Sequence, residues 1–316
     1  MKKRGMEGHV FVIGNGFDLD LGLKTKYSNF ADSDFWIKDD KNQMCKYLNN
    51  SKDKETWFDL EGELLNYSKR DNDDNSIYVR EMRFPDIVEG NVDYFKKLCG
   101  SLNDYIEKVQ GEQEISKECV ACNVLRAVYE NGLFSSVYSF NYTDLNRIAK
   151  QIGIDKGIKY THIHGCVADK SIILGVDETE LRKGYECFHK SSSRYYRSHD
   201  LYNSLIKAKE IVIFGLSLGS VDYSYFDAFF RRITESGLIA ENKKQYITIF
   251  TLNDESRLSL VSNLRNMGIN IQRLYAQSHF QIICTGDDGE KKELENFYAR
   301  LKKFNRKFYL NRPIIM

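Results

Sequence analysis

The stretch FVIGNGFDLDLG, residues 11–22, joins an apolar run to two closely spaced glycines. The apolar half is typical of a strand that is buried on both faces of a sheet, and the residues after it begin a helix. Gly14 and Gly16 allow the backbone to turn tightly and to expose amide N–H groups at the helix start. Such a turn can hold a phosphate; the alternative is a plain strand-to-helix turn in which Asn15 or Asp18 caps the helix.

This turn departs from the fingerprint of ordinary dinucleotide-binding proteins. Leu19 replaces the third glycine of that fingerprint, and no acidic residue follows a second strand about 20 residues further on. The sequence therefore disfavours an ordinary Rossmann dehydrogenase.

Short β-branched runs alternate with longer amphipathic stretches along much of the chain. This pattern predicts an α/β fold with a Rossmann-like, mostly parallel sheet flanked by helices. The predicted strands span residues 9–14, 134–140, 159–165, 171–175, 210–216, 246–252 and 269–276. The predicted helices after the second strand span residues 142–152, 199–209, 222–236, 254–267 and 290–307.

Strand patterns are missing between about residues 24 and 131, where apolar residues recur at helical spacing. We interpret this region as a helical insertion after the first strand, with a loop near residues 71–75. The predicted organisation is a nucleotide-binding α/β core of residues 1–23 and 132–307, an insertion subdomain of residues 24–131 and a C-terminal tail of residues 308–316.

The composition of the chain excludes several classes of partner. Its 316 residues include 46 Lys and Arg against 45 Asp and Glu, and a net charge of +1 gives no bulk attraction to nucleic acid or to an anionic membrane. No apolar run approaches the ~18 residues that a membrane span needs, and the charged start shows no secretory signal. Seven scattered cysteines in a chain of this size favour a reducing compartment, so we expect a cytoplasmic protein.

Polar side chains follow the second and third predicted strands, and ligands of open α/β sheets bind beyond such strand ends. Asn141 can hold a sugar hydroxyl or a water through its amide, or it can cap the next helix. His164 suits a general base, because a reference pKa of about 6.5 lets it exchange protons near neutrality. His162 lies on the same predicted strand face, but no third ligand stands at metal-like spacing, so no metal is expected. A core histidine bonded to a backbone carbonyl is the alternative, for His162 above all.

A second glycine turn follows the strand predicted at residues 210–216. Like the first turn, the turn with Gly215 and Ser217 can bind a phosphate, and Asp222 is placed to cap the next helix. Asn253 follows the strand predicted at residues 246–252, where it can bind ribose hydroxyls or cap a helix.

The motifs GNGFD (14–18), SFNYT (139–143), HIHG (162–165) and FGLSLGSVD (214–222), in this order, resemble the AbiH family of bacterial abortive-infection proteins, and through it the sirtuin-like superfamily. In sirtuin-like proteins two glycine turns contact the phosphates of NAD, and an asparagine and a histidine act at the nicotinamide ribose. The resemblance therefore implies that Asn141 and His164 are catalytic. The residues that it implies for binding NAD, together with the polar neighbours in the same turns, are Gly14, Asn15, Gly16, Asp18, Gly215, Ser217, Asp222 and Asn253.

The segment TWFDLE, residues 56–61, resembles an acidic helix of AbiH-like insertions. Its Glu61 is a candidate to reach the cleft, whereas Thr56 and Asp59 form a capping box in the alternative interpretation. The role of this helix stays open at this point.

Two features depart from the resemblance. Deacylating sirtuins carry a paired CxxC zinc module, but this chain has the single pair Cys119 and Cys122, so neither structural zinc nor protein deacylation is expected. Leu216 stands where many AbiH-like turns have a histidine.

The resemblance implies an anti-phage protein that binds NAD and hydrolyses it at the nicotinamide–ribose bond. Two alternatives stay open: a module that senses NAD or ADP-ribose without turnover, and a defence effector that cleaves nucleic acid. In a third alternative the protein has this fold without the activity, and Asn141 is a helix cap and His164 a core residue. The expected partners are a small-molecule nucleotide, further copies of the chain, and an unidentified phage or protein trigger, without a membrane.

Overall fold

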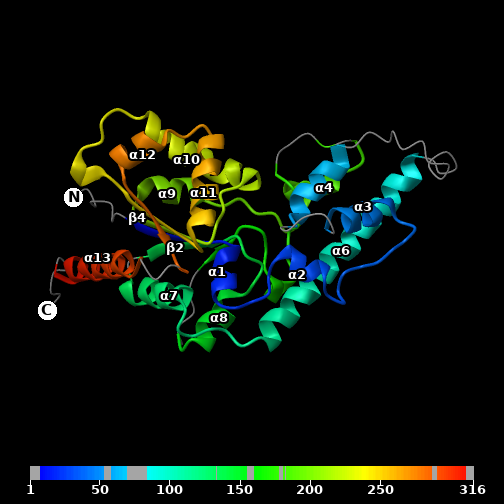
Figure 1. The fold of residues 1–316 in the computed structure, drawn as a ribbon, viewed down its shortest axis with the longest axis horizontal. Helices are drawn as coiled ribbons and strands as arrows, with labels where there is room; N and C mark the ends of the chain where they lie inside the picture. The colour runs from blue at the N-terminus through cyan, green and yellow to red at the C-terminus, as the bar shows by residue number, and fades with distance from the viewer. Residues whose placement is uncertain are drawn as a thin grey trace.

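The computed structural model describes residues 8–52, 58–69, 84–132, 134–154, 160–177, 181, 183–286 and 290–310. Its centre is a six-stranded, all-parallel sheet in the order β3-β2-β1-β4-β5-β6 (Figure 1). The strands are β1 (Gly8–Ile13), β2 (Phe134–Ser139), β3 (Thr161–His162), β4 (Ala208–Phe214), β5 (Tyr246–Thr251) and β6 (His279–Cys284). The predicted α/β, Rossmann-like sheet is therefore confirmed.

The strand order places β1 in the middle of the sheet. Val12 of β1 pairs with Tyr138 of β2 on one side and with Ile213 of β4 on the other. The chain runs outward from β1 to β3 and then returns to β4, so the order reverses between β1 and β4. In open parallel sheets ligands bind outside the carboxyl ends of the strands at such a reversal. The turns after β1 and β4 are therefore the expected place for a site.

Helices cover both faces of the sheet, because successive side chains of a strand point to opposite sides. Phe11 and Ile13 of β1 belong to one apolar cluster, and Val10 and Val12 belong to the other. The first face is covered by helices α1 (Asn15–Asp20), α7 (Val120–Asn131), α8 (Leu145–Gln151) and α13 (Lys291–Leu310) (Figure 1). The second face is covered by α9 (Leu201–Lys207), α10 (Tyr223–Glu235), α11 (Asp254–Asn266) and α12 (Ile271–Gln277).

Every element that the structure describes between β1 and β2 is a helix. These are α1 (Asn15–Asp20), α2 (Tyr27–Ala31), α3 (Gln43–Lys52), α4 (Leu60–Lys69), α6 (Phe84–Glu112) and α7 (Val120–Asn131). α3, α4 and α6 extend to the right of the sheet in Figure 1, and Leu48 of α3 and Leu98 of α6 belong to the same apolar cluster as Phe11 of β1. The division into core, insertion and tail stays a prediction, and the loop predicted at residues 71–75 lies outside the described residues.

Two predicted strands are wrong. Residues 271–276 of the strand predicted at 269–276 lie in α12, which Asn270 caps by accepting a hydrogen bond from the N–H of Arg273 at 3.0 Å. β6, which the pattern did not predict, follows this helix. Residues 171–175 form no strand, although Ile173 there is buried. A short apolar run reports burial, and a buried irregular segment or a short helix gives the same run as a strand.

The other predicted elements agree with the structure within a few residues, except that β3 has only two residues. Short 3-10 helices complete the fold: η1 (Val167–Asp169), η2 (Glu186–Phe188), η3 (Lys190–Ser192), η4 (Ser220–Asp222) and η5 (Glu241–Lys243). Among the described helices, none is both long and apolar enough to cross a membrane.

Candidate functional site

The turns after β1 and β4 pack directly against each other at the carboxyl edge of the sheet. Gly14 donates its N–H to the carbonyl of Phe214 at 2.8 Å, and Gly16 donates to the carbonyl of Gly215 at 2.9 Å. A Cβ atom on Gly16 would lie 2.6 Å from the Cα of Gly215, and Gly215 itself has a φ of +70°, which favours glycine. The close approach of two backbones therefore requires these glycines, and their role in binding phosphate stays a prediction.

Asn141 ties the end of β2 to the first glycine turn. Its Nδ2 donates to the carbonyl of Gly14 at 3.0 Å, and its own carbonyl lies 3.1 Å from the Nδ1 of His162. Asn141 is 6% exposed, and no described residue donates a hydrogen bond to its Oδ1. This oxygen is the group through which Asn141 can act on a ligand.

Asn15 and Asp18, the two candidate caps of α1, make other contacts. The helix begins without a side-chain cap, so the capping interpretation is wrong. The Oδ1 of Asn15 accepts from the hydroxyl of Thr25 at 2.6 Å, and Thr143 donates to the carboxylate of Asp18 at 3.0 Å. Burial raises the pKa of Asp18 to about 7, although hydrogen bonds to its carboxylate oppose this shift.

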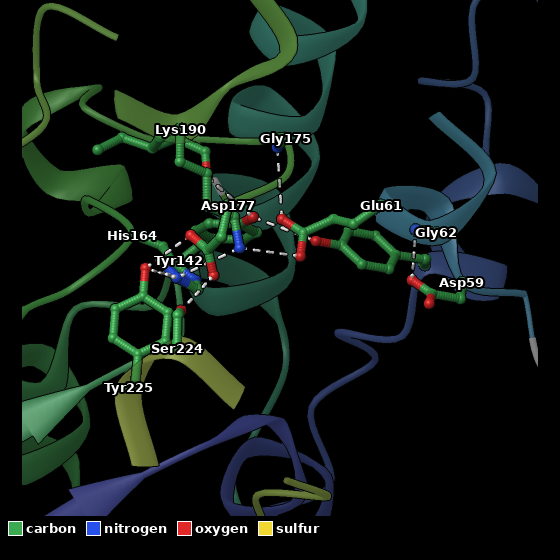
Figure 2. A network of polar contacts seen from close by, with 12 residues as sticks. Asp59, Glu61, Gly62, Tyr142, His164, Gly175, Asp177, Lys190, Ser224 and Tyr225 are labelled. Atoms are coloured by element: carbon green, nitrogen blue, oxygen red, sulfur yellow. Dashed lines mark hydrogen bonds and ion pairs between the residues drawn. The ribbon is translucent and has the colours of Figure 1, made fainter. Parts of the chain in front are cut away.

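His164 lies just beyond β3, at the centre of a buried polar network (Figure 2). Its Nε2 lies 3.4 Å from the Nζ of Lys190 and 3.4 Å from the hydroxyl of Tyr225. Lys190 forms an ion pair with Glu61 at 3.2 Å, and Tyr225 donates to the Oδ1 of Asp177 at 3.0 Å. We call these five residues the His164 network; they come from α4, the segment after β3, η3 and α10.

The distances in the His164 network indicate which groups donate. Tyr225 has one hydroxyl proton, and it lies closer to Asp177 than to His164, so it donates to the carboxylate. The ammonium of Lys190 carries only donors, so it donates to Glu61 and to the Nε2 lone pair of His164. This assignment leaves the ring proton of His164 on Nδ1.

The charges in the network depend on one another. Burial lowers the pKa of His164 well below its ordinary value, and Lys190 and His199 lower it further, so His164 is neutral at pH 7. Burial opposes the charge of Lys190, but Glu61, Asp177 and Asp222 outweigh it and raise the pKa of the ammonium. Burial raises the pKa of Glu61 against the attraction of Lys190. Each partner of such a buried ion pair makes the burial of the other tolerable.

Asp222 was predicted to cap the helix that follows it, and this prediction is wrong. The residue directly precedes α10, but its carboxylate makes no capping hydrogen bond. It is 7% exposed, and burial raises its pKa to about 7 against the attraction of Lys190. Asp222 lies next to the His164 network, because Ser224 and Tyr225, two and three residues further along the chain, both donate to the carboxylate of Asp177.

Ser217 and Asn253 also follow strands, but neither is bonded to a described residue of the His164 network. Ser217 is exposed, and its hydroxyl accepts from the N–H of Gly219 at 3.3 Å. Asn253 is exposed and caps α11 by accepting from the N–H of Ser256 at 3.0 Å. The capping alternative holds for Asn253, and contact of either side chain with a ligand stays a prediction.

A cavity of about 680 Å³ lies apart from this network, between α6, α8 and η1. Charged residues of both signs line it, and Arg147 forms an ion pair with Glu107 there at 3.0 Å. None of the predicted site residues lines this cavity.

A family model described as "Bacteriophage abortive infection AbiH" matches residues 10–240. The chain belongs to the AbiH family. The matched range includes the whole His164 network and Asp222, but Asn253 lies beyond it. Membership indicates a role in defence against bacteriophage by abortive infection. A search of curated proteins gives no match.

The histidine and cysteine pairs of this AbiH chain have local partners. β3 ends at His162, so His162 and His164 do not share a strand face as predicted. Cys119 caps α7 by accepting from the N–H of Cys122 at 3.4 Å, and both thiols donate to the carbonyl of Ser116. Within the described part of the chain, no group of three or more His, Cys, Asp or Glu side chains is arranged to hold a metal ion.

Three members of the network in this AbiH chain were not predicted from its sequence: Lys190, Asp177 and Tyr225. None directly follows a strand, which is the rule that pointed to His164. Lys190 stands in the polar run HKSSS, where a lysine is expected to be solvated. No local signal marks it as buried, because its environment is formed by segments distant in the sequence.

Proposed function

We propose that this AbiH protein binds NAD and hydrolyses the bond between nicotinamide and ribose, which would deplete NAD in an infected cell. One observation supports this most: a buried, neutral imidazole, His164, lies beside an ion pair at the carboxyl edge of a sheet in the Rossmann order. That edge is where nucleotides bind in such sheets. The proposal also rests on the resemblance to sirtuin-like proteins, which use NAD.

The reaction makes modest demands on the protein. Nicotinamide leaves with the electron pair of the C–N bond and is neutral, while positive charge develops on the ribose. Water then adds to the ribose carbon and gives up a proton, so the products are nicotinamide, ADP-ribose and one proton. The site must orient water, stabilise the positive charge and exclude bulk solvent.

Two residues are assigned to the water in this proposal. The free Oδ1 of Asn141 accepts a hydrogen bond from the water or from a ribose hydroxyl and so orients it. The Nε2 of His164 takes the proton. Its contacts with Lys190 and Tyr225 are both 3.4 Å, which is longer than an ordinary hydrogen bond, so a water can compete for the lone pair.

A nucleotide sensor without turnover is the second candidate, and the burial of the two central residues favours it. Asn141 is 6% exposed and His164 is 7% exposed, and both are engaged by other residues of the chain. In this case NAD or ADP-ribose would bind and change the conformation. The burial also fits a resting hydrolase that a phage or protein trigger, or assembly with further copies, must open.

Nicotinamide release measured by NMR tests the proposal, with ADP-ribose followed in the same spectra. Removing the proton acceptor in His164→Ala, or the water-orienting amide in Asn141→Ala, should lower the rate at least about 100-fold. His279→Ala is the matched control, because His279 begins β6 at the opposite edge of the sheet. Unchanged turnover in either test variant would contradict the roles, and saturable binding without nicotinamide release in any oligomeric state would favour the sensor.

A further inference from the structure

Asp222 is a buried carboxyl group that no described residue supplies with a hydrogen bond. Its backbone is well anchored, because its N–H donates to the carbonyl of Gly219 at 2.8 Å. Its side chain is 7% exposed all the same. A carboxylate that is so largely buried is poorly hydrated, and a positive charge on a ligand would offset its own charge.

The charges around Asp222 do not neutralise it. Lys190 acts on it most strongly, and Glu61, Asp177 and Asp59 add negative charge. The ammonium of Lys190 is already shared between Glu61 at 3.2 Å and His164 at 3.4 Å. Asp177 takes its hydrogen bonds from the hydroxyls of Ser224 and Tyr225.

Counting the charges gives a surplus of negative charge. Glu61, Asp177, Asp59 and Asp222 are four carboxyl groups against the one ammonium of Lys190, so negative charge exceeds positive charge as soon as two of them are ionised. The imidazoles nearby do not offset this surplus, because burial lowers the pKa of both His164 and His199. Opposite charge is attracted strongly to such a place, where the effective dielectric is low.

We propose that Asp222 makes this site selective for a ligand that carries a positive charge. The inference rests on the proposed function, in which the cation is the nicotinamide ring of oxidised NAD. Reduced NAD has a neutral ring and would be bound more weakly. The same surplus of negative charge would stabilise the positive charge that develops on the ribose as nicotinamide leaves.

The preference of the site for a positively charged ligand should weaken as the pH falls below about 7. Burial raises the pKa of Asp222 to about 7, so the carboxyl takes up a proton as the pH falls through 7 and loses its charge. Glu61 on α4, Asp59 before it, Asp177 after β3 and Lys190 on η3 face the same place and set the remaining field. Protonation thus removes part of the surplus, and the remaining carboxylates are balanced more closely by Lys190.

The carboxyl group of Asp222 should also make the stability of the ligand-free protein depend on pH. Between about pH 4 and 7 the folded state holds the proton of Asp222 while the unfolded state has released it, so stability falls as the pH rises through this window. Asp222→Asn keeps the shape and removes the charge, so its unfolding temperature should exceed that of the wild type at pH 8 and equal it near pH 4. This comparison also shows that the variant folds.

Binding by calorimetry tests the selectivity, with oxidised and reduced NAD as probes at pH 8 and pH 5.5. The wild type should prefer the oxidised form by at least about tenfold at pH 8, and Asp222→Asn should reduce that preference to about threefold or less. Asp254→Asn is the matched control, because Asp254 lies in the first turn of α11 with its side chain 79% exposed. It should keep the wild-type preference.

A second pair of probes separates this inference from the proposed function. The 1-methylnicotinamide cation and neutral nicotinamide differ in charge and need no dinucleotide site. Equal binding of oxidised and reduced NAD would overturn the charge selectivity and leave NAD binding intact. If neither dinucleotide binds, an Asp222-dependent preference for 1-methylnicotinamide would support the selectivity and overturn the proposed function. Absence of selectivity with both pairs, or a preference unchanged in Asp222→Asn, would overturn the inference.

Discussion

Lys190 is 1% exposed, and its ammonium lies between Glu61 of α4 and His164. A buried charge loses its hydration, and here the ion pair and one further hydrogen bond replace it. Lys190 therefore favours the ionised form of Glu61 against the effect of burial, and its ammonium faces the Nε2 of His164. Removing either side chain of this ion pair would leave the charge of the other buried without a partner.

Lys190→Met should lower the free energy of unfolding by about 3–5 kcal/mol at pH 8, because it leaves Glu61 buried without a counter-charge. Urea unfolding followed by circular dichroism measures this change. Lys96→Met is the control: Lys96 pairs with Asp93 on the surface with its side chain 68% exposed, and its loss should cost less than about 0.5 kcal/mol.

The double variant Glu61→Gln with Lys190→Met removes both charges and should recover more than half of that loss. A loss in Lys190→Met no larger than that in Lys96→Met would show that the buried ion pair is not formed in solution.

Among the elements, the two glycine turns after β1 and β4 define the edge of the sheet at which the site lies. Gly16 leaves no room for a side chain, because an added Cβ would meet the Cα of Gly215 at 2.6 Å. A backbone atom cannot move aside as the end of a flexible side chain can. The turns therefore act as one unit, and a change in one displaces the other.

Gly16→Ala should destabilise the protein by about 1–3 kcal/mol, because the methyl group forces the two turns apart. Gly100→Ala is the matched control: Gly100 lies inside α6, and an added Cβ meets no atom within 4 Å. That substitution should stabilise the helix by about 0.5–1 kcal/mol. Thermal unfolding of both variants measures the difference, and a Gly16→Ala protein as stable as the wild type would contradict the packing of the turns.

Elements that alternate regularly between apolar strand and amphipathic helix could be predicted from the sequence, and those without a distinctive period could not. The central strands β1, β4 and β5 are buried on both faces and give long apolar runs. Residues 171–175 give the same kind of run, because they are buried as an irregular segment. β6 was missed because the stretch HFQIIC places polar residues among its apolar ones, while the preceding helix α12 offered a competing run.

For the whole molecule, the fold places side chains from distant parts of the chain at one edge of the sheet. Asn141, His164 and the glycine turns could be predicted there, because residues directly after parallel strands share that edge whatever the details of packing. Lys190 and Asp177 could not, because no strand or long helix positions them. Their burial depends on α4 and α10 closing over them, which is a property of the tertiary fold.

Glu61 connects the helices between β1 and β2 to the edge of the sheet. Asp59 accepts from the N–H of Gly62 at 3.2 Å and so caps the start of α4, while the carboxylate of Glu61, two residues further on, accepts from Lys190. The capping box predicted for this segment includes Thr56, which lies outside the described residues; among the described ones, Asp59 caps α4 and Glu61 contacts Lys190. Movement of α4 would therefore act directly on Lys190 and His164.

The most direct test of the central claim, that the His164 network is a site for NAD, is imidazole ¹⁵N NMR of the six histidines with and without NAD. His164→Ala identifies the signals of His164, and His279 at the start of β6 serves as an internal reference. The proposal predicts that NAD shifts the Nε2 signal of His164 at a saturable concentration while the signals of His279 stay in place. An unchanged His164 signal at NAD concentrations that saturate the protein, or no binding of NAD at all, would contradict it.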